Sequence, residues 1–159
     1  MILYIDKRKD ICCAAPLIVN ENDEIQYSVK KNPTILSLLL GRFKILQAFV
    51  PFKKYFQKHI NFHKDYRKDE IQSSYLSGCF LIVKSTTYHA IKGFTKEFFL
   101  HLEDADFSRK CSLIGRTIHL PKAKVIHKWE RGSHKSIIQM FHLTKSIWVY
   151  LSIWGIKLY

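Results

Sequence analysis

Short apolar runs alternate along this chain with segments of helical periodicity. Residues 11–19, ICCAAPLIV, form an uninterrupted apolar run that predicts a buried strand, and residues 75–84 predict another. Residues 103–115 predict a helix, because apolar side chains recur there at spacings of three and four. Strands that alternate with helices favour an α/β domain built of layers.

The remaining segments carry weaker signals. Residues 33–50 predict one helix, and residues 53–70 predict a mobile loop or an ill-defined helix. Residues 85–93 predict a short helix, and residues 116–127 predict two short strands broken by a proline. A last helix is expected from about Ser136 onward.

The net charge restricts the partners of the chain. Its 159 residues include 26 Lys and Arg against 13 Asp and Glu, which gives a formal charge of +13. A surface of this kind attracts polyanions such as nucleic acid, anionic lipid headgroups and sugar nucleotides. The hydrophobic content of 47% excludes a disordered chain.

The cysteines and the apolar segments bear on the compartment. The four cysteines show no CxxC spacing, which argues against a zinc site, and isolated thiols in apolar runs indicate a reducing compartment. No apolar run reaches the ~20 residues that a membrane-spanning helix needs. The segment at 146–159 is aromatic and apolar, so it either lies on a bilayer or packs as a terminal helix. We expect a protein that is either free in the cytoplasm or peripheral on the inner face of the cytoplasmic membrane.

Three carboxylates, Glu103, Asp104 and Asp106, lie within four positions of a basic chain. Carboxylates in the first turn of a helix interact favourably with its positive end, by roughly 0.3–1 kcal/mol each, so the cluster is explained by a helix start alone. The alternative is a catalytic base, which must be held close to a substrate hydroxyl in a pocket. Strand-to-helix junctions are where α/β folds carry such groups.

A series of short motifs surrounds this cluster. In chain order they are Ser77-Gly78-Cys79, Gly93-Phe94, Phe98-Phe99, Glu103-Asp104-Ala105-Asp106-Phe107, Arg109, Gly115, Pro121, Ala123 and Val125-Ile126-His127. In the order and spacing of these motifs, residues 77–136 resemble the C-terminal half of family-2 glycosyltransferases of the rhamnosyltransferase-like type. Those enzymes carry, in the same order, the motifs SGA, GGFDE-FF and EDVDL-R, then a glycine, and then a stretch of the form P-A-hydrophobic-H. Residues 14–39 resemble the preceding segment of that family more weakly.

The resemblance implies a GT-A fold and an inverting transfer from a nucleotide-diphospho-sugar to a lipid-linked or cell-surface polysaccharide acceptor. By this analogy Asp104 deprotonates the acceptor hydroxyl, and Glu103 and Asp106 orient it or bind the acceptor. A divalent metal, Mn²⁺ or Mg²⁺, would steady the departing diphosphate.

Further residues acquire roles by the same analogy. His127 matches a histidine that in some relatives binds the metal beside the aspartates of a DXD motif, although a structural histidine at a strand end explains it equally well. Ser77, Gly78 and Cys79 match a segment that lines the acceptor side, and Gly78 is also explained by packing alone. Trp129 is a candidate for stacking on a sugar ring, or a plain core or rim tryptophan.

The chain also departs from the family pattern. The GFD motif appears as Gly93-Phe94-Thr95, and the only Asp-X-Asp spacing is that of residues 104–106. The nucleotide-binding half of the family, with its DXD motif, has no counterpart here. We therefore expect a partial GT-A fold that lacks the N-terminal nucleotide-binding strands: a fragment, the product of a disrupted gene, or one half of a split enzyme with a separately encoded N-terminal half.

These expectations define two units and a rival function. Residues 1–135 would form the acceptor-side part of a GT-A domain, and residues 136–159 a helical segment at the membrane surface. The chain alone would show no sugar transfer. The rival is a basic, non-catalytic protein that binds nucleic acid or membranes, which the charge and the 14% aromatic content also support.

Overall fold

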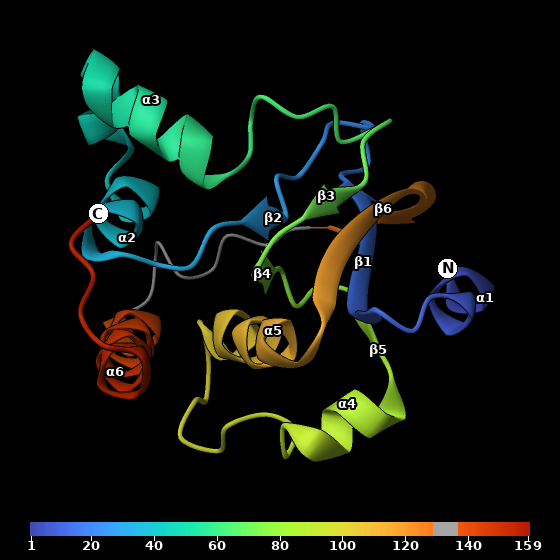
Figure 1. The fold of residues 1–159 in the computed structure, drawn as a ribbon. Coiled ribbons are helices and arrows are strands. Elements are labelled where there is room, and N and C mark those ends of the chain that lie inside the picture. Colours follow the sequence, from blue (N-terminus) through green and yellow to red (C-terminus); the bar gives the residue numbers. More distant parts are fainter. Residues whose placement is uncertain (129–136) are drawn as a thin grey trace.

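The centre of the molecule is a four-stranded mixed sheet in the order β3-β6-β1-β5 (Figure 1). The computed structural model describes residues 1–128 and 137–159. The two central strands run parallel and the two short edge strands run antiparallel to their neighbours. The strands of this sheet are β1 (Ile11–Val19), β3 (Ile71–Gln72), β5 (Ile82–Val83) and β6 (Arg116–Ile126). The predicted α/β class is confirmed.

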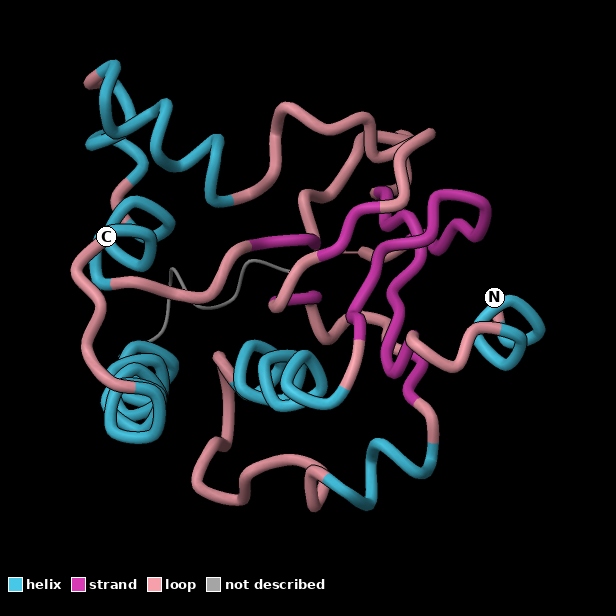
Figure 2. Tube along the Cα trace, viewed as in Figure 1, coloured by secondary structure: helices cyan, strands magenta, loops and turns pink. Residues whose placement is uncertain are grey.

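Helices surround this sheet (Figure 2). They are α1 (Ile2–Lys7), α2 (Ile35–Arg42), the 3-10 helix η1 (Lys44–Ala48), α3 (Val50–His59), α4 (Ser85–Ala90), α5 (Glu103–Ile114) and α6 (Ile137–Trp154). A second sheet pairs β2 (Val29–Lys30) with β4 (Tyr75–Leu76). In Figure 1, α2, α3 and α6 gather at one end of the molecule and α1 lies at the other.

Strand β1 is buried along its whole length, as its apolar run predicts. Successive side chains of a strand point to opposite faces, so β1 contributes to two cores. Cys13 and Leu17 share a cluster with Phe107 of α5, whereas Ala14 lies in a cluster with Ile5 of α1. Helix α5 therefore covers one face of the sheet.

The predicted pair of strands at 116–127 is wrong, because β6 is one strand with a bulge. Leu120 pairs with Pro16 of β1, and the next pair joins Lys124 to Leu17. Residues 121–123 thus leave the ladder. Pro121 has no N–H to donate, which is why the excursion occurs there.

The prediction of one strand over residues 75–84 is also wrong. This segment forms β4 and β5, which belong to different sheets, with a turn between them. The apolar run hides the turn, because its only turn-forming residue is Gly78.

The predicted helix at 33–50 divides into α2, η1 and the start of α3. Thr34 begins α2 with a capping box, in which its hydroxyl accepts from the Ser37 N–H. Pro51 lies in the first turn of α3, where a missing N–H costs nothing, so the chain restarts a helix there. Residues 53–59 are consequently helical rather than a loop.

Helix α6 packs against α5 in a core of its own. Val149 and Tyr150 share this core with Phe98, Leu102 and Ala105. Ser146 Oγ donates to the carbonyl of Leu100 at 2.6 Å. None of the helices in the described residues is long and apolar enough to cross a membrane.

We predict that Phe107→Ala lowers the free energy of unfolding by about 3–5 kcal/mol, because Phe107 is buried against β1 and its removal leaves a cavity. Leu113→Ala on the exposed side of the same helix is the matched control and is expected to change it by less than about 0.5 kcal/mol. Urea unfolding followed by circular dichroism measures both values. Equal losses in the two variants would contradict the packing described above.

Candidate active site

Asp104 is the member of the carboxylate cluster that is held in place yet partly open. Its Oδ2 accepts from the Gly78 N–H at 2.9 Å. Its Oδ1 accepts from the Tyr75 hydroxyl at 3.3 Å and from the Ala105 N–H at 2.8 Å. The side chain is half-buried. Asp104 therefore ties the first turn of α5 to the turn that follows β4.

Gly78 permits this contact because it lacks a side chain. A Cβ added at Gly78 would lie 2.9 Å from the Cβ of Asp104, which is closer than such atoms approach. The turn and the helix could not then keep their present separation. Gly78, which the sequence explains either by lining of the acceptor side or by packing, therefore packs against the predicted base.

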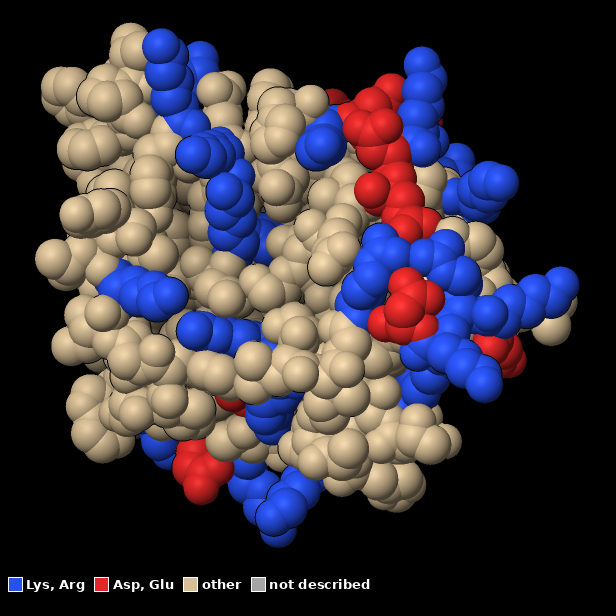
Figure 3. All heavy atoms as spheres, viewed as in Figure 1, with Lys and Arg blue, Asp and Glu red and all other residues tan. Residues whose placement is uncertain are grey.

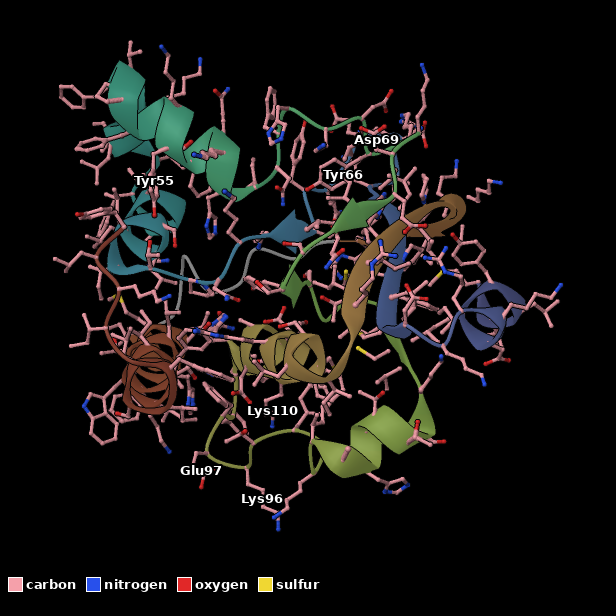
Figure 4. All side chains as sticks on the ribbon, viewed as in Figure 1. Tyr55, Tyr66, Asp69, Lys96, Glu97 and Lys110 are labelled. Carbon is pink, nitrogen blue, oxygen red and sulfur yellow. The ribbon has the colours of Figure 1, made fainter. Side chains whose placement is uncertain are left out.

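Asp106 has a different environment. It is fully buried, and its Oδ2 accepts from the Thr95 hydroxyl at 2.6 Å and forms an ion pair with Lys110 at 3.2 Å. Its Oδ1 accepts from the indole N–H of Trp154 at 2.9 Å. Lys110 also donates to the Gly93 carbonyl, and Figure 4 shows it between α5 and the loop that precedes this helix. Asp106 thus joins α5 to that loop and to the end of α6.

Glu103 precedes Asp104 in the first turn of α5. Its Oε2 is buried and has no hydrogen-bond partner among the described residues. Burial raises the pKa of Glu103, and the charge of Asp104 adds to the shift. Glu103 therefore binds a proton more readily than an exposed glutamate does.

The backbone immediately before the cluster is strained. His101 has a φ of 70° and Leu102 a φ of 62°, although neither is glycine. Two consecutive residues in this left-handed region cost free energy, of the order of 1–3 kcal/mol each, and such strain clusters at functional sites. The strained turn fixes the direction in which α5 starts, and so the position of Asp104.

Three residues predicted for the site, from two distant parts of the sequence, line one small pocket. We call it the turn pocket, and its volume is about 120 Å³. Ser77 and Cys79 reach it from the turn that holds Asp104, and His127 reaches it from the end of β6. The lining residues are Gln26, Tyr27, Ser28, Lys30, Ser77, Cys79 and His127.

The imidazole of His127 is oriented by Gln26. The Gln26 side-chain amide donates to the carbonyl of His127 at 2.6 Å, so its oxygen faces the ring Nδ1 at 3.0 Å. Nδ1 then donates, and Nε2 keeps its lone pair. That nitrogen can accept a hydroxyl proton or bind a metal.

A second cavity of about 250 Å³ is called the helix pocket here, and Tyr75, whose hydroxyl donates to Asp104, is one of its lining residues. Tyr75 and Lys30 line it, and the Lys30 ammonium lies 5.1 Å from the centre of the Tyr75 ring. Burial and the Asp104 charge raise the pKa of Tyr75, so its hydroxyl keeps its proton and donates to Asp104. The lining residues are Lys30, Pro33, Ser37, Leu38, Gly41, Arg42, Phe56, His59, Tyr75, His101, Leu102 and Leu143.

The residues present do not fit a complete divalent-metal site. The described part of the chain contains no group of three His, Cys, Asp or Glu that could hold a metal ion. Cys79 shares the turn pocket with His127, but burial raises the pKa of its thiol, and a thiolate is what metals bind. Asp106 is one of the two aspartates in the only Asp-X-Asp spacing of the sequence, and both of its carboxylate oxygens already bind partly buried partners. Trp129, predicted for acceptor binding, lies outside the described residues.

Comparison with known proteins adds no relative. The chain matches no family model, no curated protein and no solved structure. The likeness to family-2 glycosyltransferases rests on the motif residues alone and stays a prediction.

The sequence did not single out Tyr75, Lys30 or His101. Tyr75 reads as an ordinary strand residue, and Lys30 is one of many lysines. Their nearness to Asp104 depends on the pairing of β2 with β4, in which Lys30 lies opposite Tyr75.

We predict that Gly78→Ala lowers the free energy of unfolding by about 1–3 kcal/mol, because the new methyl group overlaps Asp104. Gly41→Ala is the matched control: its Cβ would meet nothing closer than 3.8 Å, and alanine favours the helix. Chemical denaturation of both variants measures the difference. A Gly78 variant as stable as the wild type would show that Asp104 does not pack against this turn.

We predict a loss of stability in mild acid that originates at His59. Burial, with Lys30 and Lys31 nearby, lowers the pKa of His59 from 6.5 to about 4. The unfolded chain therefore binds a proton that the folded chain does not, and stability falls as the pH drops from about 6.5 to about 4, by about 3 kcal/mol at most.

Replacing His59 by Phe should flatten the dependence of the unfolding free energy on pH over this window. His63→Phe alters an exposed histidine nearby and should leave the slope unchanged. Unfolding curves recorded at a series of pH values give both slopes. An unaltered slope in the His59 variant would rule out its burial as the cause.

Proposed function

We propose that this chain forms the acceptor side of an inverting glycosyl transfer, with Asp104 as the general base. The motif series from Ser77 to His127 supports this function, and the α/β class of the mixed sheet is compatible with the partial GT-A fold that we propose. The observation that carries the proposal is the position of Asp104. It is half-buried and is held by Gly78 and Tyr75. Tyr75 lines the helix pocket, and the residues on either side of Gly78 line the turn pocket, although Asp104 itself lines neither.

The carboxylate of Asp104 keeps room for a substrate. A carboxylate offers about four acceptor positions, and the Gly78 N–H, the Tyr75 hydroxyl and the Ala105 N–H occupy three of them. Among the described residues, Oδ2 accepts only from Gly78. A hydroxyl that approaches from the side of the turn can therefore donate to Oδ2 while the existing contacts fix the carboxylate.

The proposed step is a single displacement. The acceptor hydroxyl gives its proton to Asp104 Oδ2, and its oxygen forms a bond to the anomeric carbon of the donor sugar. The bond from that carbon to the diphosphate breaks, and the nucleoside diphosphate leaves with the electron pair. Ser77 and the Nε2 of His127 offer hydrogen-bonding groups for the acceptor in the turn pocket. Because the described residues do not fit a metal, we place the metal and the donor nucleotide on a separately encoded half.

We predict that Asp104→Asn lowers the transfer rate by about 10²–10⁴-fold, since the amide cannot take the proton. Glu97→Gln removes an exposed carboxylate from the preceding loop and should leave the rate unchanged. The assay measures nucleoside diphosphate released from a panel of nucleotide sugars, with the nucleotide-binding half and an extract of lipid-linked acceptors present. The chain alone is expected to release none.

Two outcomes would contradict the proposal. If Asp104→Asn folds and transfers at the wild-type rate, the cluster is a helix start stabilised by the dipole and nothing more. If no nucleotide sugar supports transfer with the added half, the motif series does not indicate a transferase. Circular dichroism of each variant separates loss of chemistry from loss of folding.

A further inference from the structure

Helices α2, η1 and α3 form a corner of the molecule whose exposed side chains are either apolar or basic. Between residues 35 and 59 the sequence has five Lys and Arg and neither Asp nor Glu. Figure 3 shows this corner at the upper left in tan and blue, whereas most of the red side chains on this face lie at the opposite side, near β3 and β6. The chemistry of this corner differs from that of the mixed-charge surface elsewhere.

Large apolar side chains project from the corner into solvent. Ile45 is 80% exposed, Phe49 63% and Val50 61%. The rings of Phe49 and Phe52 contact each other edge to face, with centroids 6.2 Å apart. We define the basic apolar corner as Leu39, Phe43, Lys44, Ile45, Phe49, Val50, Phe52, Lys53 and Lys54, all of which are exposed.

The lysines of the basic apolar corner are open to an external anion. Lys44, Lys53 and Lys54 have no carboxylate within ion-pair distance among the residues that the structure describes. They alternate in the chain with the exposed apolar residues, so charge and apolar surface lie together. This combination is what an interfacial segment uses: apolar side chains enter the acyl boundary and the basic groups meet lipid phosphates.

A comparison with α1 shows that exposure alone does not make such a surface. Ile2 and Leu3 of α1 are also exposed, but Asp6, Asp10 and Glu70 lie on or near that helix. Those carboxylates would be repelled by anionic lipid. The absence of acid from residues 35–59 therefore separates this corner from α1, and residues 137–159 share that absence.

We propose that the basic apolar corner binds the surface of a bilayer that contains anionic lipid. A bilayer fits better than nucleic acid, because Ile45 and Val50 are aliphatic and cannot stack on bases. The corner adjoins the segment at 146–159, because the first two N–H groups of α2 donate to the carbonyls of residues 157 and 158. The proposal stands whether or not Asp104 is a catalytic base.

The experiment is sedimentation of the full chain with vesicles of phosphatidylcholine alone or mixed with phosphatidylglycerol. We expect binding to the mixed vesicles that weakens as salt is added, and little binding to the neutral ones. Lys53→Glu with Lys54→Glu should weaken partitioning at least about tenfold. Ile45→Ser with Phe49→Ser should weaken it comparably at all salt concentrations.

Matched controls distinguish binding through this corner from effects of net charge and from nonspecific hydrophobic adsorption. Lys7→Glu with Lys9→Glu makes the same change in charge at the opposite end of the molecule, and Leu3→Ser with Leu113→Ser removes exposed apolar groups elsewhere. Both controls should bind mixed vesicles nearly as the wild type does. Equal losses in controls and corner variants, no vesicle binding by the wild type, or binding to single-stranded DNA in its place would each overturn the proposal.

Discussion

The parallel pairing of β1 with β6 determines the rest of the molecule. Eight residue pairs join the two strands, and β1 is buried on both faces. A strand in that position needs a cover on each side, which α5 and α1 supply. Because α5 leads directly into β6, the same pairing fixes the direction of α5 and brings its first turn next to the turn at residues 77–80.

Three carboxylates that are similar in the sequence differ in burial and in hydrogen bonding in the structure. Asp106 is enclosed and paired, Glu103 has a buried oxygen that favours a proton, and Asp104 is oriented by neutral donors with one position open. The different environments of the three carboxylates are set by backbone geometry rather than by residue type, because the strained residues His101 and Leu102 determine how α5 begins. The proposed base is the one carboxylate of the three that is both fixed and reachable.

The sequence predicts those features that depend on local pattern. Strand β1 and helix α5 follow from their periodicity. The division of residues 75–84 between two sheets could not be predicted, because its cause is a contact with Asp104, far along the chain. Residues 53–70 predict only a loop or an ill-defined helix because their charged and aromatic residues show no clear period, whereas the structure begins α3 at Val50 and ends it at His59. The bulge at Pro121 was mistaken for the end of a strand.

The bond between Asp106 and Trp154 makes the last turn of α6 a latch on the first turn of α5. Asp104 lies only two residues from Asp106, so a displacement of the C-terminal helix is transmitted to the proposed base through less than one helical turn. Opening the latch would also leave an acceptor without its donor inside the protein, which costs enough to make the change abrupt rather than gradual. Any event that moves α6 away from α5 would therefore change the position of Asp104.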